Sequence, residues 1–256
     1  MTEYFKNIDN TLQYFLNSLA IEVYRKKGVT AWFSGINNKN INVVYSNSDI
    51  ADIDNQIADI TDFFNKHNVQ WSWVITPYTK PANLDKILYS HAFKLTDTVI
   101  TMAYDLKALN SEPLLHNCLI KEVTDVKGMT DWAIVVNEAF GATEDNKMDY
   151  RDAFMKIPFS GNNAFHHYVV YVDNQPVSTG TLSLSKYGAR IDNVGTRINY
   201  LRKGFGSAIT QYIMHAAKRL GYEYCYLDAS DEGIIMYKKL GFTECYKSKI
   251  YGKIIA

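Results

Sequence analysis

The sequence predicts a mixed α/β fold, and three observations support this prediction. Hydrophobic residues make up 47% of the 256 residues, which is ample for a buried core. Short apolar runs typical of strands alternate with segments of helical periodicity along the whole chain. A strand-like segment also runs directly into a glycine-rich turn that opens a helix, within residues 193–220. This alternation is typical of helices packed on a sheet.

The chain is long enough for two domains, and one segment is the expected junction between them. Residues 1 to about 110 and residues 116–256 each alternate between helical and strand-like segments. Pro113, in the joining segment 109–115, discourages a continuous helix there. We therefore expect an amino-terminal domain over 1–110 and a carboxy-terminal domain over 116–256.

The helix after the glycine turn is the clearest single element. Its apolar residues recur at three- and four-residue steps, and Gly221 supplies a stop. These residues are Phe205, Ala208, Ile209, Tyr212, Ile213, Ala216 and Leu220. The other expected elements of the second half are helices over 125–140 and 148–156, strands over 166–173 and 177–183 with a turn at 173–176, strands over 189–196 and 223–228, a short helix over 233–240, and a closing antiparallel pair across 242–255.

The first half carries a weak internal repeat of the second. Residues 70–77 resemble 223–230, and residues 88–93 resemble 237–242. The first copy has no glycine-rich turn before Trp71, and Leu88 stands opposite Tyr237. We expect one working site and one structural copy, with chance similarity between two α/β segments as the alternative.

Composition and charge exclude several classes of function. Lys plus Arg and Asp plus Glu both number 27, so the chain gives no reason to expect nucleic acid as a partner. We expect no membrane association and a cytoplasmic protein, because neither a leader nor a spanning apolar stretch is evident. The three cysteines have no paired spacing, which argues against a disulfide framework and against a metal site.

The glycine turn is built to hold an anion. Gly204 and Gly206 allow close approach of a ligand to the backbone, and the free N–H groups of the following helix favour negative charge. Arg202 and Lys203 add positive charge beside it. The turn is not a P-loop, and Ile209 occupies the place of the third glycine of a dinucleotide fingerprint. A simple tight loop is the competing interpretation.

Three elements in this order resemble the GNAT superfamily of acetyl-CoA-dependent N-acyltransferases. They are the strand ending in Asn193-Val-Gly-Thr196, the turn Arg202-Lys-Gly-Phe-Gly-Ser207, and the late block 227–242. The resemblance covers roughly Leu119 to the carboxy terminus, and it implies a GNAT-like fold in two tandem copies, the first degenerate. One departure is Leu201, which stands where the family's turn usually has Arg or Gln.

The resemblance implies roles for individual residues. Val194, Gly195 and Thr196 would pair with the pantetheine arm of acetyl-CoA, and a backbone N–H near Val194 would face the thioester oxygen. Tyr237 would be the general acid, against the alternative that it only packs in the core. Asp192 and Glu138 are candidates for the general base, although each is also explained as a solvated carboxylate or a helix-end charge. The implied coenzyme-binding residues are Val194, Gly195, Thr196, Arg202, Lys203, Gly204, Phe205, Gly206, Ser207 and Ser230.

The resulting hypothesis is an N-acetyltransferase that moves the acetyl group of acetyl-CoA to a primary amine of a small molecule by direct attack on the thioester. A homodimer is compatible with it. The alternatives are acetylation of a protein N-terminus or lysine, and a non-catalytic acyl-CoA-binding module.

Overall fold

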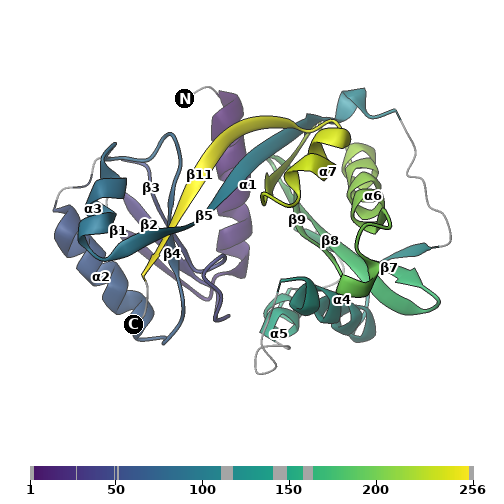
Figure 1. Ribbon diagram of the computed structural model, residues 1–256, viewed down its shortest axis with the longest axis horizontal. Helices are drawn as coiled ribbons and strands as arrows, with labels where there is room; N and C mark the ends of the chain where they lie inside the picture. Colours follow the sequence, from purple (N-terminus) through teal and green to yellow (C-terminus); the bar gives the residue numbers. More distant parts are fainter. Residues whose placement is uncertain are drawn as a thin grey trace.

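The fold is built on one mixed sheet of eleven strands. The computed structural model describes residues 3–26, 28–48, 50, 52–110, 118–140, 149–157 and 164–253. The strand order across the sheet is β1-β2-β3-β4-β11-β5-β10-β9-β8-β7-β6 (Figure 1). The expected mixed α/β fold is therefore confirmed. The predicted junction around Pro113 lies outside the described residues.

The elements of the two halves follow the same order of helices and strands from β1 and from β7 onward. Those of the first half are α1 (Glu3–Leu19), β1 (Glu22–Lys26), β2 (Val29–Phe33), β3 (Val43–Ser46), α2 (Ile53–Asn65), β4 (Ser72–Ile75), α3 (Leu84–Ser90), β5 (Phe93–Asp105) and the 3-10 turn η1 (Leu106–Ala108). Those of the second half are β6 (Leu119–Glu122), α4 (Val126–Ala139), α5 (Asp149–Met155), β7 (Phe165–Val172), β8 (Gln175–Ser185), β9 (Gly188–Thr196), the 3-10 turn η3 (Ile198–Tyr200), α6 (Phe205–Arg219), β10 (Tyr224–Ala229), α7 (Ile234–Lys239) and β11 (Thr243–Lys253).

Local sequence accounts for several of these boundaries. The Asp125 carboxylate accepts a hydrogen bond from the Gly128 N–H at 2.7 Å and so caps α4. Asp173 and Asn174 both take positive φ, 49° and 62°, in the two-residue turn between β7 and β8. Tight hairpins favour such turns, and Asp and Asn tolerate them better than other residues with side chains.

The internal repeat appears in the structure as two equivalent series of elements. The series β3-α2-β4-α3-β5 matches β9-α6-β10-α7-β11 in order and type. In both, the first two strands pair in parallel over only two residue pairs, Val43 with Ser72 and Val44 with Trp73, and Ala189 with Cys225 and Arg190 with Tyr226.

The last strands of the two halves are exchanged. β11 lies between β4 and β5, and β5 lies between β11 and β10 (Figure 1). The expected closing antiparallel pair across 242–255 is therefore wrong. The described part of that segment forms one strand over Thr243–Lys253, and its antiparallel partners are β4 and β5 of the first half.

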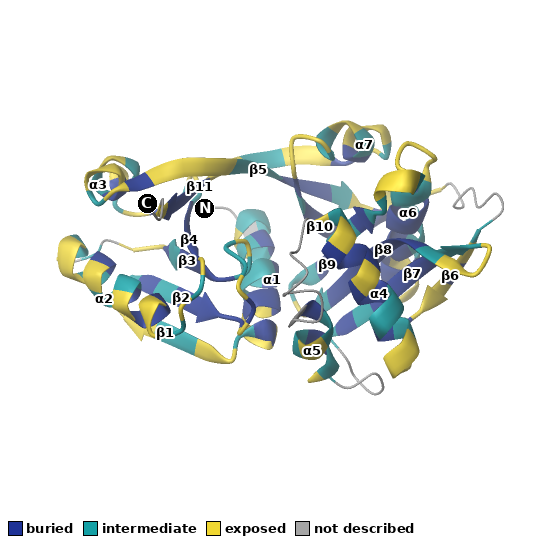
Figure 2. Cartoon of the chain, turned by 60° about the horizontal axis from the view of Figure 1, so that its bottom comes forward, coloured by how far each residue is buried: buried dark blue, intermediate teal, exposed yellow. Residues whose placement is uncertain are grey.

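One helix of the first half packs against both halves. Phe15 and Leu16 of α1 share a hydrophobic core with Trp32 of β2 and with Met129 and Trp132 of α4. Figure 2 shows α1 between the two groups of strands. A second core gathers α6, α7 and the strands of the second half on the opposite face, with Ile209, Ile213 and Leu227 among its buried residues. The region where β9 and β10 meet thus has α6 on one face and α1 on the other.

Candidate functional site

The glycine turn presents uncapped backbone donors. Gly204 is the N-cap residue of α6 with a left-handed φ of 87°, and no side chain caps the helix. No atom within 4 Å would meet a Cβ placed on Gly204, so the space before the helix is open. The first N–H groups of a helix have no partner within it, and they favour an anion. The structure of the turn fits the predicted phosphate-binding role.

Gly206 lies where the turn meets α7 and β9. A Cβ added there would sit 3.2 Å from Met236 Sδ and 3.6 Å from Thr196 Oγ1. Lys203 places its ammonium 5.1 Å from the centre of the Tyr200 ring, within the range of a cation–π contact. Leu201 is 51% exposed and contributes neither charge nor a side-chain hydrogen-bond donor. The backbone, with Lys203 and Arg202 nearby, therefore supplies the positive character of the turn.

Beside this turn the two central strands of the second half separate. β9 and β10 pair only at Ala189 with Cys225 and at Arg190 with Tyr226. From Ile191 to Thr196, β9 has no ladder with β10 among the described strand pairs. The edge of β9 that carries Val194, Gly195 and Thr196 is thus available for pairing with an extended ligand.

A bulge in β9 lies at the point where the strands separate. Thr179 of β8 pairs with Gly195 and Thr181 pairs with Asp192, so Asn193 and Val194 together oppose one residue of β8. Asn193 has a left-handed φ of 53°. This conformation is uncommon for residues other than glycine, among which Asn and Asp tolerate it best. The sequence analysis missed this bulge, and the Asn before Val-Gly was its only local signal.

Tyr237 lies on the first turn of α7 with its ring packed in the core. The residue is 7% exposed, and its ring meets the Phe242 ring edge-on at 5.8 Å between centroids. Burial raises the pKa of the Tyr237 hydroxyl, and the negative charge of Asp192 raises it further. No hydrogen-bond partner of this hydroxyl occurs among the described residues. Tyr237 therefore keeps its proton at neutral pH and has that proton free to donate.

Asp192 belongs to a buried charged network on the α1 face of the sheet. Its carboxylate accepts hydrogen bonds from Arg190 Nε and from Ser183 Oγ, both at 2.9 Å. Arg190 Nη2 reaches the Asp228 carboxylate at 2.8 Å, and Thr101 Oγ1 donates to the same carboxylate at 2.6 Å. Burial raises the pKa of Asp192, while the Arg190 guanidinium opposes that rise.

Glu138 is engaged elsewhere. Its carboxylate accepts from Arg197 Nε at 2.6 Å and from the Ile198 N–H at 3.1 Å. These bonds tie the end of α4 to the segment that follows β9. The Ser230 hydroxyl is also engaged, because it accepts the Gly233 N–H at 3.3 Å beside the start of α7.

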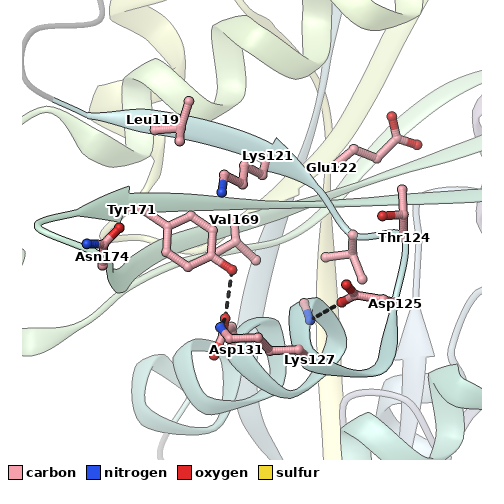
Figure 3. A pocket seen from close by; sticks show the side chains of 12 residues that line it. Leu119, Lys121, Glu122, Thr124, Asp125, Lys127, Asp131, Val169, Tyr171 and Asn174 are labelled. Atoms are coloured by element: carbon pink, nitrogen blue, oxygen red, sulfur yellow. Dashed lines mark hydrogen bonds and ion pairs between the residues drawn. The ribbon is translucent and has the colours of Figure 1, made fainter.

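One pocket lies away from the turn, at the sheet edge formed by β6 and β7 and beside α4. It has a volume of about 500 Å³, and none of the sequence-predicted site residues lines it (Figure 3). Asp131 stands in it, accepting from the Tyr171 hydroxyl at 2.8 Å and pairing with Lys127 at 2.7 Å. Asp131 and Lys127 of this pocket thus compensate each other.

The described residues contain neither a metal-binding cluster nor a membrane-spanning helix. There, no cluster of three or more His, Cys, Asp or Glu side chains is arranged to hold a metal ion. In the same ranges, no helix combines the length and apolar character needed to cross a membrane.

Comparison with known proteins gives one matching family. Residues 163–244 match the family described as acetyltransferase (GNAT) domain. This stretch contains β9, the glycine turn, β10 and α7. No curated protein sequence matches the chain.

Solved structures resemble the chain over nearly its whole length. A GCN5-related N-acetyltransferase from Kribbella flavida covers 97% of the chain and 95% of its own length, with a TM-score of 0.76 at 14% identity. A conserved protein of unknown function from Staphylococcus epidermidis covers 92% and 95%, with a TM-score of 0.68 at 14% identity. A tandem GNAT protein of the clavulanic acid biosynthesis pathway covers 97% and 96%, with a TM-score of 0.62 at 9% identity. The chain therefore has the fold of these tandem GNAT structures, and within its second half residues 163–244 match the acetyltransferase (GNAT) domain family.

Proposed function

We propose that the protein is an acetyl-CoA-dependent N-acetyltransferase that acts on a primary amine of a small molecule. The observation that carries the proposal is the separation of β9 from β10 directly beside the uncapped turn at Gly204. This pairing of features provides an open strand edge for an extended amide chain and a cluster of backbone donors for its phosphates.

The residues present fit acetyl-CoA. Gly204 leaves open space before α6, and a side chain at Gly206 would fill the space between the turn and Met236. The phosphates would meet the backbone of Gly204, Phe205, Gly206 and Ser207, with Arg202 and Lys203 adding charge; Val194, Gly195 and Thr196 would bind the pantetheine arm. When bound, acetyl-CoA supplies an activated acetyl thioester.

We assign the proton donor to Tyr237. Burial holds its pKa above the ordinary value, so the hydroxyl stays protonated throughout the neutral range. A general acid must carry its proton at the working pH. The Val194 N–H is assigned to the thioester oxygen, where a fixed donor stabilises the negative charge that develops during attack.

Asp192 is the better candidate for the general base. It lies on β9 next to the bulge, and its charge acts on the Tyr237 hydroxyl. Glu138 instead binds Arg197 and the Ile198 N–H. On the same face, Asp192 and Asp228 share one guanidinium. Burial raises the pKa of Asp9 in α1, and the Asp228 charge raises it further. This excess of carboxylates favours an acceptor that approaches as an ammonium ion.

The domains proposed from the sequence, 1–110 and 116–256, receive different roles. In the first half, the helix equivalent to α6 is α2, which is capped by Asp52 and carries Asp54 in its first turn. Carboxylates at this end of a helix disfavour a phosphate ligand. We assign coenzyme binding to the second half and shaping of the acceptor cleft to the first.

The test is acetyl transfer from acetyl-CoA to a panel of mono- and diamines, with lysine peptides and a peptide with a free N-terminus alongside. We expect turnover with small amines that is lost in Gly206→Trp. Turnover confined to peptides would favour the protein-acetylation alternative. Tight acetyl-CoA binding without transfer to any amine would favour the non-catalytic module, for which Leu201 is the supporting observation.

A further inference from the structure

The bulged end of β9 is held by hydroxyl groups of the neighbouring strand. Thr179 Oγ1 donates to the Asn193 carbonyl at 3.1 Å, and Ser178 Oγ donates to the Gly195 carbonyl at 2.7 Å. Ser178 and Thr179 are both fully buried. The two carbonyls that these hydroxyls hold therefore have fixed directions in a part of the strand where the bulge interrupts the regular ladder.

The direction of each carbonyl sets the direction of one N–H group. The Asn193 carbonyl and the Val194 N–H belong to the same planar trans peptide, so they point in opposite directions. Because Thr179 lies on β8, the Asn193 carbonyl points toward β8 and the Val194 N–H points away from it. In the sheet order, the neighbour of β9 on that other side is β10, where the two strands have separated.

The hydrogen bond from the Thr179 hydroxyl also changes how strongly the Val194 N–H can donate. A hydrogen bond accepted by an amide carbonyl polarises the whole amide, which makes its N–H a better donor. Thr179 thus acts on the Val194 N–H through one peptide group, in orientation and in polarity.

The side chain of Asn193 is held from the same strand. Its Nδ2 lies 3.4 Å from Thr181 Oγ1, which in turn lies 2.9 Å from Nδ1 of the buried His167. Burial lowers the pKa of His167 to about 3, so the imidazole is neutral at pH 7. The left-handed residue is therefore anchored at its carbonyl and at its side chain.

We propose that Thr179 is a positioning residue for acetyl transfer, and that its hydroxyl aims and polarises the Val194 N–H toward the thioester oxygen. This inference rests on the proposed function, because the thioester is the group that the N–H would meet. Thr179 itself contacts neither substrate nor coenzyme in this account.

The test compares Thr179→Val, which keeps the shape and removes the hydroxyl, with Thr179→Ser, which keeps the hydroxyl. The matched control is Thr11→Val, because Thr11 is 2% exposed and donates to the Ile8 carbonyl at 2.7 Å in α1. Removing a direct oxyanion donor lowers kcat by about 10²–10³, so losing its indirect support should lower kcat about tenfold. The KM for acetyl-CoA should change less than about twofold, because the glycine turn is untouched.

A second readout does not depend on turnover. The carbonyl stretch of acetyl-CoA labelled with carbon-13 at the acetyl carbonyl is recorded by infrared difference spectroscopy, with no amine present. We expect binding to the wild type to lower this frequency, Thr179→Val to lose most of the shift, and Thr179→Ser and Thr11→Val to keep it. If Thr179→Val does not fold, Thr179→Cys, whose thiol is a weaker donor, should show a reduced shift.

The outcomes separate the two proposals. A wild-type protein that does not bind acetyl-CoA would contradict the proposed function and this inference with it. A wild type that binds and turns over, while Thr179→Val behaves like Thr11→Val in both kcat and carbonyl frequency, would overturn the role of Thr179 and leave the function standing.

Discussion

Arg190 Nε donates to the Asp192 carboxylate at 2.9 Å, and the two side chains are only 5% and 11% exposed. The same guanidinium binds Asp228. Burial raises the pKa of Asp192, and the positive charge of Arg190 opposes that rise. Loss of the Arg190 charge should therefore raise the pKa of Asp192 further.

Asp192→Asn should remove the acidic limb of the pH profile of kcat/KM. A general base works only when it is deprotonated, so activity in the wild type falls as the pH drops through the pKa of Asp192. We expect kcat/KM to fall about 10²-fold or more in the variant, with acetyl-CoA affinity retained. Glu138→Gln tests the other candidate base and should keep the limb if Asp192 is the base. If the acidic limb is kept in Asp192→Asn and lost in Glu138→Gln, the general base is Glu138.

Tyr237→Phe should lower kcat by about 10²-fold, because the variant lacks the proton that the leaving thiolate requires. Because the pKa of Tyr237 is raised, ionisation of this hydroxyl should not limit the wild-type rate at or below pH 9. Steady-state kinetics across pH measures both effects. Tyr212→Phe, a partly buried tyrosine of α6, is the matched control. Equal turnover in the two variants would remove Tyr237 from the mechanism.

The stability of the protein should fall at acid pH because of His167. The folded state holds the pKa of His167 at about 3, against an ordinary value of 6.5. The unfolded chain therefore binds this proton first, and stability is lost as the pH falls below about 6.5. At pH 5 the loss should be ~2 kcal/mol relative to pH 8. Urea unfolding of His167→Asn should show a smaller pH dependence, whereas His166→Asn should resemble the wild type.

The second half should not fold alone. A fragment of residues 116–256 lacks β5, which pairs with both β10 and β11. Both strands would then expose unpaired edges. We expect the fragment to aggregate or to lack a cooperative thermal transition, and co-expression with residues 1–115 to rescue it. A monomeric fragment with a sharp transition would show that the strand exchange is dispensable.

Elements that depend on local sequence could be predicted from the chain. The spacing of Phe205, Ile209 and Ile213 predicted α6, and the glycine turn with Gly204 predicted where this helix begins. The turn at Asp173 and Asn174 also follows from residues that tolerate positive φ. Such features depend on neighbours within a few residues.

Contacts between residues that are distant in the chain could not be predicted from the sequence. The exchange of β5 and β11 depends on pairing between residues such as Thr98 and Lys249, which no periodicity records. The ion pair between Asp192 and Arg190 could not be predicted either, because the presence of both residues on one strand does not indicate that they are buried or that they share a charged network. Asn193 alone gave no sufficient signal for the bulge. The candidate site was thus predictable at its turn, but its charged face and its bulged strand were not.

Gly206→Trp addresses the coenzyme site itself. A side chain at this position would collide with Met236, since even a Cβ would lie 3.2 Å from its sulfur. We expect calorimetric titration to show acetyl-CoA binding lost in Gly206→Trp and unchanged in Arg219→Trp, at the far end of the same helix. Both variants should keep a cooperative thermal transition.

The most direct measurement is thermal unfolding of the wild-type protein and Gly206→Trp, each with and without acetyl-CoA. Ligand at about 100 times its Kd adds about 2.7 kcal/mol to stability, which should raise the wild-type Tm by roughly 5–11 °C. The account predicts that rise in the wild type and none in Gly206→Trp. No rise in the wild type at millimolar acetyl-CoA would contradict a coenzyme site between β9, β10 and the glycine turn.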